Sequence, residues 1–354
     1  MYRTQRSFDR LAGIPNCVYW AKGYEGELAE VRFNGSGYRA DMEFGPKQPG
    51  TYRIVLVGSS FAMGLGAESG KTASGSLPAE LSGRARRRVE LYNEAIEGWG
   101  GTPRNIASRF NKVLSAQPDM VLWILTAWDI RNASGMWPSD EILPNESRQF
   151  PEKGSPTDGA QSASSGLARL HSKAEAVANS TRDAARELWR NSRSYLMLTH
   201  FWYELESQSM YLKSANLWQN DAQYLGAVPS EKRLHHLQEF DGYAAKIAAQ
   251  AKAANVSLVT VFLPNRQHAA VLSMGEWPSN IDPFSLDNEL RSIIVGHGGT
   301  YLDILPAYRK IPNAEMGYSV DGHPNPEGNA TIAGLLAKAL TSGAVPALKA
   351  VPRP

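Results

Sequence analysis

The sequence has a single cysteine, Cys17, among 354 residues. One cysteine excludes an internal disulfide framework and a cysteine-based metal site, and it argues against redox chemistry. No apolar run approaches the roughly 18 residues that a membrane-spanning helix needs, and the longest candidate covers only residues 195–203. The first ten residues also lack the apolar core of a signal peptide. Two localisations stay open: the cytoplasm if this is the full chain, or an exported or membrane-anchored protein whose signal or anchor is missing here.

Neither charge is in excess. The 37 lysines and arginines against 35 acidic residues give a net charge of +2, which does not favour a nucleic-acid partner. The one basic cluster, Arg84 to Arg88, runs into an apolar segment and is interpreted as a solvated helix end. The stretch G-A-E-S-G-K-T at 66–72 resembles a phosphate-binding loop, but Leu65 stands where that motif requires glycine. We therefore predict no nucleotide site.

Short β-branched or apolar runs alternate with stretches of helical spacing. The five runs are Arg53 to Val57, Val89 to Tyr92, Met120 to Leu125, Val256 to Leu263 and Thr300 to Ile304. Such alternation is typical of a parallel sheet with helices on both faces. The sequence predicts a three-layer α/β/α fold with a five-stranded, flavodoxin-like parallel sheet.

The chain divides into a core and additions. Residues 1–50 are expected to form an irregular N-terminal extension with a turn at N-G-S-G-Y-R, residues 51–345 the α/β domain, and residues 346–354 a tail. The interval of about 131–235 interrupts the alternation and is interpreted as an insertion between the third and fourth strands. Its Gly/Ser-rich first part is expected to be mobile. Its aromatic second part, with Phe201, Trp202, Tyr203 and Trp218, is either a helical lid over a site or a satellite core.

Two serines follow the first predicted strand in V-G-S-S-F-A-M-G-L-G at 57–66. This position lies at the carboxyl edge of the sheet, where open α/β folds bind their ligands. A helix that starts there directs backbone N–H groups at charge developing beside the hydroxyl. The pattern suits a serine nucleophile, although for this stretch alone a simple helix N-cap at Ser59 or Ser60 is the favoured explanation.

A second motif favours the nucleophile. Asp321 and His323 stand two residues apart in V-D-G-H-P-N-P-E-G-N, just before the last predicted helix. Residues at this spacing share one face of an extended segment, so a carboxylate there can orient an imidazole that takes a proton from serine. The other six histidines have no neighbouring carboxylate at a useful spacing and are interpreted as surface or packing residues: His171, His200, His235, His236, His268 and His297.

Together these motifs resemble the SGNH (GDSL-type) hydrolase family over roughly residues 50–130 and 255–342. Gly58-Ser59-Ser60-Phe61 is similar to the family's first block and implies that Ser60 is the nucleophile. Y-N-E-A-I-E-G-W-G is similar to the second block and implies that Gly98, with the Ser60 N–H, holds the oxyanion. D-G-H-P-N-P-E-G is similar to the fifth block and implies that Asp321 and His323 complete the triad.

Two positions depart from the family pattern. Ser59 replaces the usual aspartate of the first block, so the carboxylate that normally braces the turn is absent there. In the third block, T-A-W-D at 126–129 stands where the family has G-x-N-D, so Trp128 replaces the asparagine of the oxyanion hole. Losing one such donor typically slows the reaction by on the order of a hundred- to a thousandfold. The Trp128 indole and Asn132 are the candidate substitutes.

The resemblance implies a serine esterase that acts on a small acyl ester, with an acetylated carbohydrate as the favoured substrate. It needs neither a metal nor an organic cofactor. Two alternatives stay open: an O-acyltransferase that uses the same triad, and a catalytically impaired carbohydrate-binding module, for which the departures at Ser59 and Trp128 argue. The sequence does not determine the oligomeric state.

Overall fold

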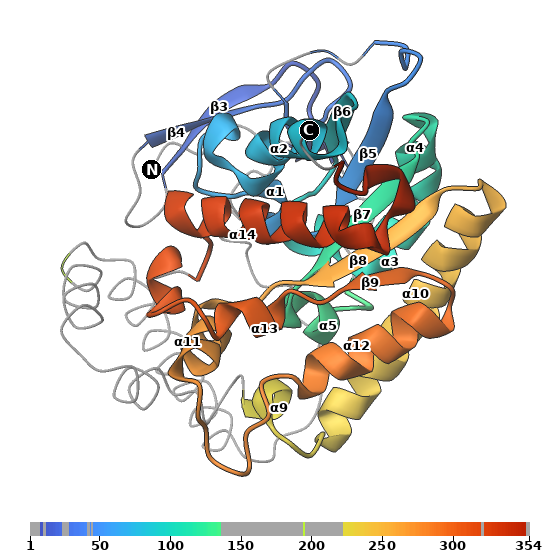
Figure 1. Ribbon diagram of the computed structural model, residues 1–354. Coiled ribbons are helices and arrows are strands. Elements are labelled where there is room, and N and C mark those ends of the chain that lie inside the picture. Colours follow the sequence, from blue (N-terminus) through green and yellow to red (C-terminus); the bar gives the residue numbers. More distant parts are fainter. Residues whose placement is uncertain are drawn as a thin grey trace, which may run out of the picture. The chain divides into compact units, whose positions relative to one another are not determined.

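Five strands form one parallel sheet in the order β6-β5-β7-β8-β9 (Figure 1). They are β5 (Tyr52–Val57), β6 (Val89–Asn93), β7 (Met120–Leu125), β8 (Ser257–Phe262) and β9 (Thr300–Leu302). Every residue of β5 and β7 is buried, as expected for parallel strands covered on both faces. The predicted sheet is confirmed, and its strand order is that of flavodoxin-like folds.

The computed structural model describes residues 8–9, 12–22, 28–40, 43, 45–135, 194, 222–319 and 322–351. The sheet belongs to a compact unit of residues 1–138 and 206–354. Most of the predicted insertion at 131–235 lies outside the described residues, including all four aromatic side chains assigned to a lid or satellite core. The domain boundaries and the role of the insertion therefore stay predictions.

Helices cover both faces of the sheet. On one face α2 packs along α14, and on the other α10 contacts α3, α4 and α12 (Figure 1), which confirms the three-layer arrangement. The helices are α1 (Ser60–Met63), α2 (Ala73–Ala85), α3 (Pro103–Ser108), α4 (Phe110–Ser115), α5 (Ala127–Arg131), α9 (Ala222–Leu225), α10 (Glu231–Ala253), α11 (Arg266–Met274), α12 (Ser285–Gly296), α13 (Leu305–Tyr308) and α14 (Pro326–Ala339). None of these described helices is both long and apolar enough to cross a bilayer.

Polar side chains fix where four helices begin, namely α2, α10, α11 and α14. At each start the side-chain oxygen of the N-cap residue accepts a hydrogen bond from the backbone N–H three residues later; the caps are Thr72, Ser230, Asn265 and Asn325. Each cap satisfies a donor that the helix itself cannot, and is worth about 1 kcal/mol. The core between the layers is aromatic as well as aliphatic: Trp123 of β7 is fully buried, with its ring 5.4 Å from that of Phe240 on α10.

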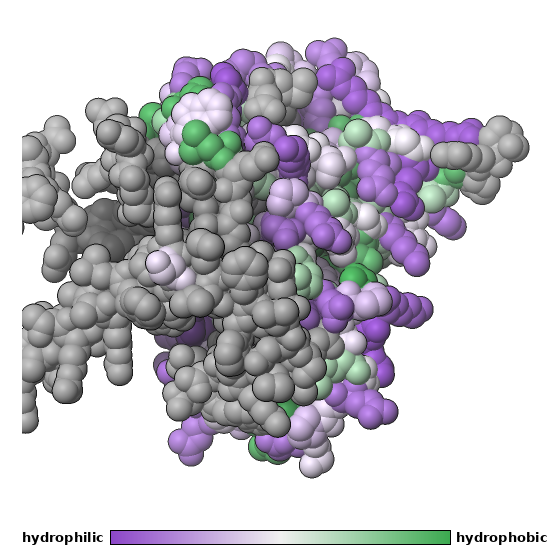
Figure 2. Space-filling model, turned by 90° about the vertical axis from the view of Figure 1, so that its left-hand side faces the viewer, coloured by the Kyte–Doolittle hydropathy of each residue, from purple (hydrophilic) through white to green (hydrophobic). Residues whose placement is uncertain are grey.

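The N-terminal segment is more ordered than the sequence indicated. We expected irregular chain up to residue 50, but β3 (Val18–Lys22) pairs with β4 (Leu28–Arg32) in an antiparallel hairpin, and a short pair, β1 (Phe8–Asp9) and β2 (Ala12–Gly13), precedes it. The hairpin exposes three apolar side chains on its outer face: Val18, Trp20 and Leu28. Figure 2 views this side of the molecule, where apolar residues lie among hydrophilic ones. Apolar residues on both faces of the hairpin obscure the alternation by which a strand is recognised.

Candidate active site

Ser60 lies at the carboxyl edge of the sheet, as the first residue of α1. Gly58 makes the turn from β5 into α1 with a φ of +151°. A Cβ at Gly58 would lie 2.6 Å from the carbonyl oxygen of Ile124 and 2.7 Å from the Cβ of Ala62. Only glycine fits there, because the turn passes directly over β7. Ser60 thus occupies the point between β5 and β7 where the strand order reverses, which is where such folds bind ligands.

The structure brings His323 to Ser60 from 263 residues further along the chain. His323 Nε2 lies 2.8 Å from Ser60 Oγ, within the range of a good hydrogen bond. With the imidazole proton on Nδ1, Ser60 donates to Nε2, which is the tautomer that a general base requires. The ring of Phe61 lies 5.2 Å from the imidazole and packs beside it.

The residues around His323 explain the motif that carries it. Asn325 caps α14 by accepting a hydrogen bond from Gly328 N. Gly328 is packed so tightly that a Cβ would lie 1.8 Å from the carbonyl oxygen of Gly317. The carbonyl of His323 accepts a 2.8 Å hydrogen bond from Ser319 N. The loop is therefore fixed on both sides of the imidazole.

Asp321, the predicted orienting carboxylate, lies outside the described residues. Next to it, Gly322 has a φ of +89° and donates a 2.9 Å hydrogen bond to Ser319 O, so the chain turns sharply just before the imidazole. The Nδ1 atom of His323 is buried and therefore faces protein rather than solvent. The role of Asp321 stays a prediction.

Gly98 and Ser60 are the residues whose N–H groups are predicted to hold the oxyanion. Gly98 opens a 3-10 turn after β6, with a φ of +60°. Three residues on, Gly101 packs against the turn of residues 58–60, the predicted nucleophile turn. A Cβ at Gly101 would lie 2.4 Å from the Ser59 Cα. No described residue accepts a hydrogen bond from the N–H of Ser60 or Gly98. Both N–H groups follow the carboxyl ends of neighbouring strands, β5 and β6.

The two candidates for a third donor differ in their surroundings. Asn132 Nδ2 donates to the Trp128 carbonyl at 2.7 Å, so this amide caps the end of α5. Trp128 is half-buried, and its ring lies 5.7 Å from that of Trp99 at an angle of 51°. Trp99 had no predicted role, although its position beside Gly98 was a signal. Trp99 is 37% exposed.

A carboxylate does lie beneath the nucleophile turn, but it comes from a different segment. Asp129 is 1% exposed and Ser59 is 3% exposed. The N and Oγ1 atoms of Thr126 each donate to Asp129 Oδ2 at 2.7 Å. Burial raises the pKa of Asp129 to about 6, while hydrogen bonds from Thr126 and Ser59 act to lower it. The expectation of an unbraced turn at Ser59 thus needs correction. The T-x-x-D capping pattern was the overlooked signal.

The other described histidines bond groups other than Ser60. His268 is fully buried, and its Nε2 lies 2.7 Å from Pro283 O; burial lowers its pKa to about 4. His236 lies 2.7 Å from the Tyr224 hydroxyl and stacks on that ring. These two fit the predicted packing role.

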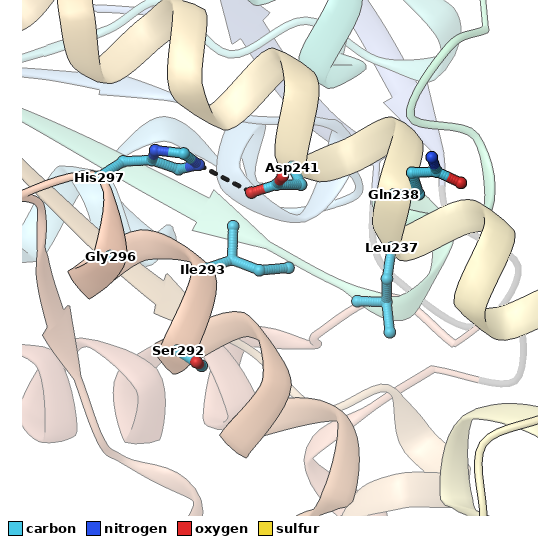
Figure 3. Close-up of a pocket in the computed structure, with 7 residues that line it drawn as sticks. All are labelled: Leu237, Gln238, Asp241, Ser292, Ile293, Gly296 and His297. Carbon is cyan, nitrogen blue, oxygen red and sulfur yellow. Dashed lines mark hydrogen bonds and ion pairs between the residues drawn. The ribbon is translucent and has the colours of Figure 1, made fainter.

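His297 is an exception to the prediction, because it does have a carboxylate partner. Its Nε2 lies 2.7 Å from Asp241 Oδ1, in an open groove of about 440 Å³ between α10 and α12 (Figure 3). Ser292 also lines the groove, but the imidazole points to Asp241 and not to that serine. His297 follows α12 and precedes β9, which puts it at the amino end of the strands, opposite Ser60.

No protein-family model matches the chain, and no curated protein matches it. Among solved structures it is similar to TesA, with 10% identity, a TM-score of 0.42 and coverage of 82% of this chain and 98% of that one. It is similar to a variant of Axe2, an acetylxylan esterase from Geobacillus stearothermophilus, with 12% identity, a TM-score of 0.41 and coverage of 85% and 97%. It is also similar to a GDSL-like lipase from Parabacteroides merdae, with 13% identity, a TM-score of 0.38 and coverage of 81% of this chain and 94% of that one. These TM-scores lie below 0.5, so none of the three establishes the family or activity of this chain.

Proposed function

We propose that the chain is a serine hydrolase of carboxylic esters, with Ser60 as nucleophile and His323 as general base. The observation that carries the proposal is the 2.8 Å contact between Ser60 Oγ and His323 Nε2. It occurs at the carboxyl edge of the sheet, beside two backbone N–H groups that no described residue uses. Asp321 is assigned as the carboxylate that orients His323, on the motif alone.

In this mechanism Ser60 Oγ attacks the ester carbonyl while its proton moves to His323 Nε2. The Ser60 and Gly98 N–H groups stabilise the oxyanion of the tetrahedral intermediate. The intermediate collapses when the bond to the alcohol oxygen breaks, and that oxygen takes the proton from His323. Water then attacks the acyl-Ser60 ester, giving its proton to His323. The second collapse returns that proton to Ser60 and releases the carboxylic acid.

A carbohydrate ester with a small acyl group is the substrate that we favour. Trp99 and Trp128 form an aromatic pair that follows β6 and β7, next to the predicted oxyanion donors. Indole rings present large, rigid apolar faces with a polar N–H at the edge, which suits a sugar ring. A sugar hydroxyl in place of water in the second step would make the enzyme an O-acyltransferase with the same residues.

The test is hydrolysis of p-nitrophenyl acetate and of an acetylated xylo-oligosaccharide by wild type, Ser60→Ala and Trp99→Ala. We expect Ser60→Ala to lose both activities. Trp99→Ala is expected to raise KM for the oligosaccharide several-fold and to leave p-nitrophenyl acetate unaffected. Transfer of acetyl to added xylo-oligosaccharide, measured by mass, would identify an acyltransferase. Binding of the oligosaccharide without turnover of either ester would instead favour the non-catalytic module.

A further inference from the structure

The motif N-G-S-G-Y-R at 34–39 folds into a turn that points inward. Asn34 Oδ1 accepts hydrogen bonds from Ser36 N and Tyr38 N, both at 3.0 Å. Gly37 has a φ of +76°, a conformation that favours glycine. Tyr38 and Arg39, which follow, are both 5% exposed. The turn therefore buries a cationic side chain, which proteins rarely do without a partner.

The partners of Arg39 are carbonyl groups at the far end of the helix that begins with Ser60. Its guanidinium donates to the backbone oxygens of Met63, Gly64 and Ala67, and the distance to Gly64 is 2.6 Å. The last carbonyls of a helix have no partner within the helix, and positive charge is favourable beside them. The planar guanidinium donates to them from two nitrogens held in a rigid fork, whereas a lysine ammonium has a single nitrogen on a flexible stem.

A second side chain reinforces this anchor. The backbone N–H of Arg39 donates to the backbone oxygen of Asn93 at 3.0 Å. The side chain of Asn93 donates to Ala62 O at 3.1 Å and to Ser74 Oγ at 2.8 Å. Asn93 is the last residue of β6 and leads into the loop that carries Gly98. The motif, the end of α1 and the predicted oxyanion loop thus share one hydrogen-bond network.

The anchor matters because α1 has only four residues. A helix this short is unstable by itself, so the direction of Ser60 depends on what holds the helix. We propose that Arg39 is a positioning residue for Ser60: it fixes the C-terminal end of α1 and so keeps Ser60 Oγ within reach of His323 Nε2. The inference rests on the proposed function of Ser60.

The variant Arg39→Lys tests the inference, with Arg233→Lys as the matched control. Arg233 is also buried, and it bonds Glu289, Ser285 and the Gly226 carbonyl on the α10–α12 side of the molecule. Because a small misplacement of reacting groups can slow a reaction by up to about a hundredfold, we expect Arg39→Lys to lower kcat for p-nitrophenyl acetate about ten- to a hundredfold with KM nearly unchanged. Labelling of Ser60 by a fluorophosphonate should slow in parallel. Arg233→Lys should lower Tm about as much as Arg39→Lys does, but keep the wild-type labelling rate.

Hydrogen exchange gives a readout that does not depend on activity. In Arg39→Lys the amides of residues 61–67 should exchange faster, and those of α12 should not. If Arg39→Lys does not fold, Asn34→Ala, which loosens the turn that carries Arg39, should show the same pattern more weakly. The inference is overturned if these variants keep the wild-type labelling rate or the wild-type exchange at residues 61–67. It is also overturned if Arg233→Lys loses as much of the labelling rate as Arg39→Lys does. An unlabelled wild type overturns the proposed function instead, and exchange then still decides whether Arg39 anchors α1.

Discussion

Two histidines of this chain make almost the same hydrogen bond in very different surroundings. His323 Nε2 lies 2.8 Å from the Ser60 hydroxyl, and His297 Nε2 lies 2.7 Å from the Asp241 carboxylate. The first pair stands at the carboxyl edge of the sheet, on a turn that only glycine can make. The second spans two helices in an open groove, where half of the Asp241 side chain is exposed (Figure 3).

Because both histidines make a short hydrogen bond, such a bond does not by itself identify a catalytic group. Ser292 lines the groove in addition to His297 and Asp241, so the groove holds all three residue types of a serine triad. Ser292 and His297 are five residues apart at the end of a helix, which places them on different faces. At the Ser60 site, packed glycines, a buried carboxylate and two N–H groups that donate to no described residue lie around the pair. The surroundings therefore distinguish the two histidines. Each of the following substitutions alters a residue at one of the two sites.

The largest effect is expected from the serines. Ser60→Ala should reduce kcat/KM for p-nitrophenyl acetate by at least about a thousandfold, because removal of the nucleophile leaves only the oxyanion donors. Ser292→Ala should leave kcat/KM unchanged. Steady-state kinetics of the two purified variants makes the comparison. Equal activity in both would remove Ser60 from the mechanism.

Replacing one glycine at each site should change the free energy of unfolding in opposite directions. Gly58→Ala forces a Cβ to within 2.6 Å of the Ile124 carbonyl at a φ of +151° and should lower the free energy of unfolding by about 2 to 4 kcal/mol. Gly296→Ala, in the groove, has open space around it and should gain roughly 0.5 to 1 kcal/mol from helix propensity. Urea unfolding measures both changes. A Gly58→Ala protein as stable as wild type would mean that the nucleophile turn is not packed as described.

Asp129 gives the nucleophile turn a pH dependence. Because burial raises its pKa to about 6, the native state binds this proton more tightly than the unfolded chain does, and the free energy of unfolding falls as pH rises from about 4 to about 6. In Asp129→Asn this contribution is absent. Relative to the variant, wild type should lose about 2 to 3 kcal/mol between pH 4 and pH 6.5. Denaturant titrations at several pH values test this, and parallel curves for the two proteins would contradict it.

The smallest effect is expected in the groove. Asp241→Asn removes the charge of an exposed partner, and exposed ion pairs contribute roughly 0 to 1 kcal/mol. The variant should keep the wild-type kcat/KM and a Tm within a few degrees. A loss of activity in Asp241→Asn would give the groove a part in the reaction that its geometry does not suggest.

The sequence predicted the features that depend on local pattern. All five strands of the parallel sheet and the position of Ser60 after the first of them followed from apolar runs and turn residues. Gly98 and Trp128 were singled out by the family resemblance. The match of Ser60 with His323 followed from two short motifs, one after β5 and one just before α14, and from their resemblance to a known family. Each motif is local, whereas the pairing across 263 residues was predicted only because the motifs together resemble a family.

What the sequence did not reveal depends on contacts between distant segments. Arg39 meets the end of α1 some 25 residues later, Asp129 supports a turn 70 residues before it, and His297 meets a carboxylate 56 residues away. Local spacing signals the Thr126–Asp129 cap, but it does not signal any of these three distant partners. The N-terminal hairpin was missed for another reason, because apolar side chains lie on both of its faces.

The most direct test of the central claim, that His323 activates Ser60, is to identify the residue that a fluorophosphonate modifies. Wild type, His323→Ala and His297→Ala would be treated at pH 7.5, digested and mapped by mass spectrometry. We predict one adduct, on Ser60, in wild type and in His297→Ala, and a rate at least about a hundredfold lower in His323→Ala. An adduct on another serine, or equal rates in all three proteins, would contradict the account.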